Sequence, residues 1–151
     1  MYEYSIYWIR EEIASHYFHK SDILYRFFGE YQDNSNRIDL RKQYLYITNR
    51  FSKNTMISHI SMHLKDNVNF HMKGSSMEIY TDRQYISLHI SEKQLKFRSG
   101  SLQDAEEILF PVLRIFQPFL FVIGNTDEKY GWITPVKLPK AERENRVLYS
   151  W

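Results

Sequence analysis

A run of four short β-forming segments between residues 68 and 98 constrains this fold more than any other feature of the sequence. The segments are rich in β-branched and aromatic residues, and short clusters containing Gly, Ser, Asp or Lys separate them. Such short connections indicate an antiparallel meander. We place the four segments at residues 68–73, 77–81, 85–90 and 95–98.

The N-terminal part of the chain changes from a strand pattern to a helix pattern. Residues 2–9 alternate, which predicts a half-buried strand rich in aromatic residues. The side that we expect to be buried consists of Tyr2, Tyr4, Ile6 and Trp8. Apolar side chains then recur at helical spacing, so residues 10–31 are predicted to form a long helix. We expect that helix to break or kink at Ser21-Asp22.

The remaining segments supply further helices and a last strand. Residues 38–47 fit either a helix or a strand, and both options stay open. Helices are predicted at about 54–64, capped by Asn54-Thr55, and at 101–116, with a kink at Pro111. On the second of these helices the inward side chains are expected to be Ile108, Val112 and Ile115. A buried strand at 119–123 and a turn back into 130–132 follow.

This order of elements predicts an α+β fold. We expect residues 1–151 to form a single domain, with a mainly antiparallel sheet and about three helices packed on it. No internal repeat and no Ser/Pro/Gly-rich linker divides the chain. Residues from about 138 to 151 are charged, and we expect them to be a loosely held tail.

The absence of cysteine and the small net charge exclude several classes of protein. Without cysteine the chain has no disulfides, no thiolate zinc site and no Cys nucleophile. A formal net charge of +2 gives no overall field that would draw the chain onto nucleic acid or an anionic membrane. The N-terminus lacks a signal-peptide pattern, and no apolar run reaches the ~20 residues that a membrane span requires. We therefore expect a cytoplasmic protein that does not bind membranes.

Six histidines are the candidate metal-binding or catalytic residues. His16 with His19, and His59 with His63, have the spacing of ligands on one helix face. A zinc site also needs a third ligand and usually a carboxylate in a fixed context, and neither pair lies in an HExxH motif. The glycines are isolated, so there is no phosphate-binding loop, and there is no GxSxG nucleophile motif. We therefore expect no enzymatic activity, no metal site and no cofactor.

Nucleic-acid binding is the alternative function, through the basic and aromatic stretch at residues 37–53. Basic residues interleave there with aromatic ones, as in surfaces that stack bases and contact phosphates. The residues concerned are Arg37, Arg41, Lys42, Arg50, Lys53, Tyr44, Tyr46 and Phe51. Asp39 interrupts the run and the net charge is small, so we regard direct nucleic-acid binding as the weaker hypothesis.

The excess of aromatic residues favours a protein that binds other proteins. Tyr, Phe and Trp make up 17% of the chain, more than a core of this size buries comfortably. On the first helix Ile13 and Tyr17 form one stripe, while Ala14 and Phe18 form the next. Either one stripe is left free to bind a partner or both belong to the core.

Three blocks of the sequence form a recognisable set. They are YWIREEIASHYF at residues 7–18, KQYLYIT at residues 42–48 and YGWITPVK at residues 130–137. Together they resemble the SirA family, the sporulation inhibitors of replication of endospore-forming bacteria, because the second block is similar to the family's KQxxYIT stretch and the third to its YGWxxPVK segment. In the last block we expect Trp132 to pack in the core and Pro135 to end the strand pairing.

The resemblance implies a non-enzymatic regulator that binds the N-terminal domain I of the replication initiator DnaA. It implies a contact surface on the first helix and on the KQxxYIT stretch, and a monomer in a one-to-one complex. The partner-binding residues expected from it are Ile13, Ala14, Tyr17, Gln43 and Tyr46. Ile13 departs from the family, which commonly has an aromatic residue at that position.

Overall fold

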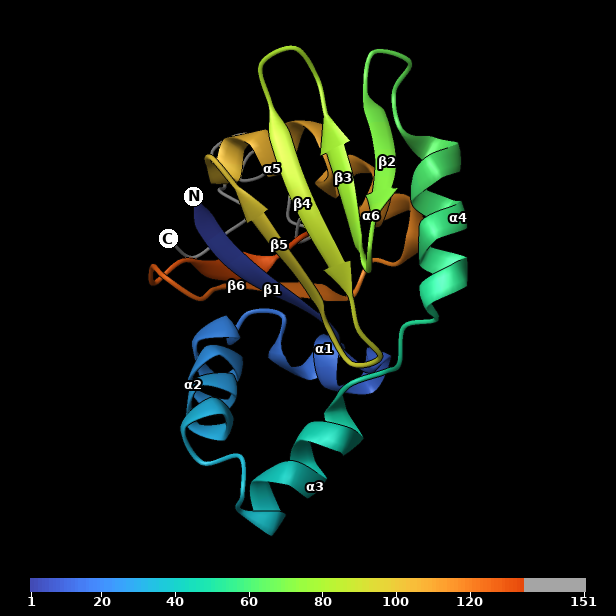
Figure 1. Cartoon of the computed structure of the whole chain (residues 1–151). Helices are drawn as coiled ribbons and strands as arrows, with labels where there is room; N and C mark the ends of the chain where they lie inside the picture. Colours follow the sequence, from blue (N-terminus) through green and yellow to red (C-terminus); the bar gives the residue numbers. More distant parts are fainter. Residues whose placement is uncertain (135–151) are drawn as a thin grey trace, which may run out of the picture.

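The computed structural model describes residues 1–134, which form a seven-stranded antiparallel sheet with helices on both of its faces (Figure 1). The strand order is β2-β3-β4-β5-β1-β6-β7, and every neighbouring pair is antiparallel. The strands are β1 (Tyr2–Trp8), β2 (Asn69–Lys73), β3 (Ser76–Tyr80), β4 (Tyr85–Ile90), β5 (Leu95–Ser99), β6 (Leu120–Gly124) and β7 (Tyr130–Trp132). The predicted α+β class and the predicted meander are confirmed. The predicted tail at about 138–151 lies outside the described residues, as does Pro135.

Strand β1 lies inside the sheet, between β5 and β6. Tyr4 pairs with Phe97 on one side and with Gly124 on the other. An interior strand with helices over both faces is buried on both faces, so the prediction of a half-buried strand is wrong. Tyr4 and Ile6 enter one hydrophobic core, whereas Tyr7 and Ile9 enter the other.

Six helices lie among residues 1–134, rather than the three that the sequence predicted. They are α1 (Glu11–Tyr17), α2 (Ser21–Asp33), α3 (Ile38–Ile47), α4 (Lys53–His63), α5 (Leu102–Ile108) and α6 (Phe110–Phe116). The ambiguous segment at 38–47 is thus a helix. The helix predicted at 10–31 is two helices, because the chain leaves helical geometry at Lys20 and begins α2 at Ser21, where a break or kink was expected.

The helix predicted at 101–116 is also divided, at Leu109, so that α5 and α6 meet at an angle and Pro111 lies in the first turn of α6. This change of direction turns Ile115 to the surface, where 62% of it is exposed, so its predicted inward position is wrong. Ile108 and Val112 are buried as expected. Helix α4 begins at Lys53, one residue before the predicted start. Its N-cap is Ser52 rather than Asn54, because Ser52 Oγ accepts the capping hydrogen bond from the Thr55 amide (3.5 Å).

Two hydrophobic cores lie on opposite faces of the sheet. The larger joins α4, α5 and α6 to the meander and β1, through residues such as Met56, Leu102 and Leu113. The smaller joins α1, α2 and α3 to the half of the sheet made by β1, β6 and β7, and Trp132 lies in it as predicted. None of the helices within residues 1–134 is long and apolar enough to cross a membrane.

Candidate functional site: an apolar groove between α1, α2 and α3

Helices α1, α2 and α3 enclose a surface groove of about 410 Å³ on the side of the smaller core. Its walls are mainly aliphatic and aromatic, with a short polar rim from α3. The lining residues are Ile13 and Tyr17 from α1, Ile23, Leu24 and Phe27 from α2, and Lys42, Gln43, Tyr46 and Ile47 from α3. Four of the five partner-binding residues expected from the sequence therefore meet at one place.

Helix α1 uses one stripe for the core and the neighbouring stripe for the groove. Ala14 is fully buried, and the ring of Phe18 stacks on Trp132 with 4.8 Å between the ring centroids. Ile13 and Tyr17, four residues apart and therefore on one side of the helix, are half-buried at the edge of the core. Ile13 and Tyr17 therefore pack against the edge of the smaller core and also line the groove. Ala14 is not at the surface, because its side chain is fully buried under α1 and does not line the groove.

Helix α3 turns one side to the core and the other to the groove. Leu40 and Tyr44 are buried, and the Tyr44 ring stacks on Tyr31 at 4.3 Å. Burial raises the pKa of Tyr44, so its hydroxyl stays neutral at physiological pH. Gln43 and Tyr46, three residues apart, point the other way, and 55% of Tyr46 is exposed.

The Tyr46 ring is held by Arg10, whose guanidinium carbon lies 4.8 Å from the ring centroid. The same arginine donates its backbone N–H to the carbonyl oxygen of Ile47 (2.9 Å), which ties the end of α3 to the segment after β1. Its guanidinium also pairs with Glu12 (3.6 Å). An aromatic ring fixed in this way loses little conformational freedom when a partner covers it.

The C-terminal end of α3 receives a cation from a distant part of the chain. Lys93 Nζ, in the turn between β4 and β5, donates to the carbonyl oxygens of Thr48 (2.8 Å) and Leu45 (3.4 Å). A cation at this position complements the negative end of the helix dipole. Burial, with the nearby Arg50, lowers the pKa of Lys93. The α3 wall of the groove is thereby attached to the meander.

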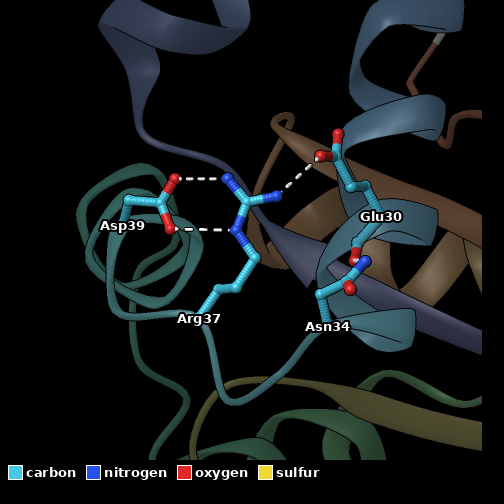
Figure 2. A network of polar contacts seen from close by, with 4 residues as sticks. All are labelled: Glu30, Asn34, Arg37 and Asp39. Atoms are coloured by element: carbon cyan, nitrogen blue, oxygen red, sulfur yellow. Dashed lines mark hydrogen bonds and ion pairs between the residues drawn. The ribbon is translucent and has the colours of Figure 1, made fainter.

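The corner between α2 and α3 is fixed by a network around Arg37 (Figure 2). Its guanidinium donates to both carboxylate oxygens of Asp39 (2.6 and 3.2 Å) and to Glu30 (3.4 Å), while Asn34 Nδ2 donates to the Glu30 carbonyl oxygen (3.0 Å). The Arg37 guanidinium holds the pKa of Asp39 below its usual range. The network spans the last turn of α2 and the first turn of α3, so it sets the angle at which these two walls meet.

The same contacts weigh against the nucleic-acid alternative. Arg37 is paired with Asp39 and Glu30, and Arg50 is paired with Glu92 (2.8 Å). Tyr44 and Phe51 are buried, so Tyr46 is the one aromatic ring of the stretch that is open to solvent. The stretch therefore offers neither a continuous run of free cations nor a stacking platform.

The histidine pairs take part in structural contacts. His59 Nε2 donates to the Val112 carbonyl oxygen (2.9 Å), which joins α4 to α6, and His63 Nδ1 donates to the His59 carbonyl oxygen (2.8 Å). Over residues 1–134, no group of three or more His, Asp or Glu side chains could hold a metal ion.

Sequence reasoning missed the α2 wall of the groove, formed by Ile23 and Phe27, and the rim residue Lys42. In one straight helix over residues 10–31, Ile23 and Phe27 would lie ten or more residues further along the same axis than Ile13 and could not contact it. The break between α1 and α2 folds α2 back beside α1 and brings them together. The available signal was the four-residue spacing of Ile23 and Phe27, together with the break expected at Ser21.

Comparisons with known proteins agree with the three sequence blocks. The family model described as sporulation inhibitor of replication protein SirA matches residues 2–137. A sporulation inhibitor of replication protein SirA from Bacillus subtilis (strain 168) is 27% identical over 143 residues, covering 89% of this chain and 94% of that protein. The family-model match extends across all three helices that form the groove.

Proposed function

This chain belongs to the SirA family of sporulation inhibitors of replication, and from that premise we propose that it binds domain I of the initiator DnaA through the groove between α1, α2 and α3. Membership of the family implies a regulator of replication rather than an enzyme. In our proposal the protein acts in the cytoplasm, as a monomer in a one-to-one complex, when a cell commits to sporulation.

One observation carries the proposal: Ile13, Tyr17, Gln43 and Tyr46 line the same groove. They come from two helices that are separated in the sequence by all of α2, and the family resemblance had associated each of them with the contact surface. A groove that gathers such residues from separate segments is the expected form of a protein-binding site.

The chemistry of the groove suits an apolar helical or loop segment of a partner. Tyr17 and Tyr46 supply rigid aromatic area with a hydroxyl at the tip, and Ile13 contributes an aliphatic wall. Gln43 and Lys42 at the rim can fix the register of the partner through hydrogen bonds. Ile13 is smaller than the aromatic residue common in the family, so the facing side chain of DnaA is expected to reach deeper here.

Calorimetric titration with purified DnaA domain I from the same organism tests the proposal. We expect saturable one-to-one binding that Tyr17→Ala weakens by roughly 5-fold to 150-fold, since truncating an interface tyrosine costs about 1–3 kcal/mol. The matched control is Ile115→Ala, which removes an exposed apolar side chain on α6, outside the groove. Absence of binding by the folded wild-type protein refutes the proposal, and equal losses in both variants refute the location.

Docking on domain I can inhibit initiation in two ways. It can block the initiator's self-association or its recruitment of other replication proteins, or it can displace the initiator from origin DNA. Footprinting of origin DNA with full-length DnaA separates the two, because only displacement removes the protected sites when this protein is added.

A further inference from the structure

The two edges of the sheet are protected to different degrees. At one end of the strand order, β7 has three residues, and two of them, Gly131 and Trp132, are buried. At the other end, β2 has five residues, and all five are exposed although α4 is drawn near this strand in Figure 1. Within residues 1–134, β2 is therefore the open edge of the sheet.

The register shows which backbone groups of β2 are free. The strand pairs with β3 over its whole length without a bulge, and the two-residue turn at 74–75 makes Lys73 and Ser76 the hydrogen-bonded pair that closes the hairpin. Bonded and non-bonded pairs alternate along antiparallel strands, so Phe70 and Met72 direct their N–H and C=O groups away from β3. No other backbone group of the described chain bonds to these two residues.

The side chains of the same two residues form an apolar strip along the open edge. Phe70 pairs with Ile79 of β3. Met72 pairs with Met77, and both β3 residues are fully buried in the larger core. Phe70 and Met72 themselves are each 41% exposed, because no further strand lies beside them. An added strand would cover the apolar strip and also bond the free backbone groups.

The open edge lacks the features by which proteins usually prevent such pairing. Natural edge strands are often interrupted by proline or a bulge, or carry a charge on the buried face. Strand β2 has no proline and no bulge, and it turns only Phe70 and Met72 to the core side. Its formal charge comes from Lys73 alone, which lies at the end of the strand on the opposite face. The edge is therefore open to the addition of a strand.

The charges on β2 indicate which kind of strand fits. Asn69, His71 and Lys73 face the other side of the sheet, and none of them is acidic. Lys73 forms no ion pair within residues 1–134, and Glu78, in the next row of this face, is only 5% exposed. A second copy of β2 brings no carboxylate to Lys73, whereas a partner strand with an acidic residue opposite Lys73 forms a stabilising cross-strand pair.

We propose that β2 accepts an extended acidic segment of a protein partner as an additional strand of the sheet. In antiparallel pairing, apolar residues of the segment lie opposite Phe70 and Met72, and a carboxylate lies opposite Lys73. The backbone of the segment supplies the hydrogen bonds, and its alternating side chains supply the specificity. The inference does not rest on the proposed function, because β2 contributes no residue to the groove between α1, α2 and α3.

The test is a titration of the ¹⁵N-labelled protein with the capped peptide Glu-Val-Thr-Val-Glu, followed by amide chemical shifts and hydrogen exchange. In antiparallel pairing its valines lie opposite Phe70 and Met72, and a glutamate lies opposite Lys73. We expect saturable shifts centred on residues 69–73 and slower exchange of the Phe70 and Met72 amides. Methylation of both valine nitrogens should abolish binding, because these N–H groups face β2. The peptide Lys-Val-Thr-Val-Lys should bind at least about twofold more weakly.

Two variants test the role of the charge. Lys73→Glu should reverse the preference between the acidic and the basic peptide. Lys20→Glu is the matched control, because it changes the net charge equally but lies at the break between α1 and α2.

Four results overturn the proposal: no binding of the acidic peptide, equal affinity for its N-methylated form, shifts outside β2 and β3, or an unchanged preference in Lys73→Glu. Dimerisation through β2 in the absence of peptide also overturns it, because a second copy then occupies the open edge. The comparison of the three peptides uses the wild-type protein, so it holds even if Lys73→Glu fails to fold.

Discussion

Tyr46→Ala is the sharpest test of the groove, because this ring is already fixed and more than half exposed. A tyrosine side chain offers roughly 200 Å², and 55% exposure leaves about 110 Å² to be covered by a partner. At about 25 cal/mol per Å² this area corresponds to roughly 2.7 kcal/mol. Part of it belongs to the polar hydroxyl, so we expect the substitution to weaken DnaA domain I binding by about 2 kcal/mol, or roughly 30-fold in Kd.

Isothermal titration calorimetry measures this loss, and chemical denaturation of each variant measures the accompanying change in stability. Leu45→Ala is the matched control, because Leu45 is the preceding residue of α3, is 44% exposed and does not line the groove. Both truncations should lower the free energy of unfolding by on the order of 1 kcal/mol. Affinity that is unchanged in Tyr46→Ala, or that falls equally in Leu45→Ala, refutes the reasoning.

Two further predictions concern the support of the groove. Phe28→Ala should lower the free energy of unfolding by about 3–5 kcal/mol in urea titrations, because Phe28 is 1% exposed and stacks on Tyr7 at 4.1 Å; a loss below ~1 kcal/mol contradicts this packing. Asp39 has a lowered pKa in the folded state, so its pairing with Arg37 contributes stability above the unfolded pKa of about 3.8 that is lost as the pH falls through the folded value. The difference in unfolding free energy between the wild type and Asp39→Asn should therefore shrink below about pH 4, and a difference that is independent of pH contradicts this assignment.

Local patterns predicted the sheet well because its meander is built from short-range signals. The turn clusters between residues 68 and 98 and the alternation within each segment locate β2 to β5 almost to the residue. The position of β1 was not predictable in this way. Its neighbours β5 and β6 lie far along the chain, so periodicity alone could not show that both faces of residues 2–8 are covered.

The candidate site was predictable in part. The family resemblance named Ile13, Tyr17, Gln43 and Tyr46, and the structure brings these four together. Ala14 was misplaced because helical spacing alone cannot tell which of two adjacent apolar stripes faces the sheet. The α2 wall was missed because its position depends on the direction that the chain takes after the break at residues 18–20.

The central position of β1 has a consequence for the timing of synthesis. Strand β1 is synthesised before its two partners in the sheet, residues 95–99 and 120–124, and helices α1 to α3 pack against Phe121, Ile123 and Trp132. A nascent chain that ends before these residues lacks the surface on which the groove is assembled. Folding of the groove therefore waits until the chain up to Trp132 has been made, and translation products that stop before this residue cannot present a complete binding surface.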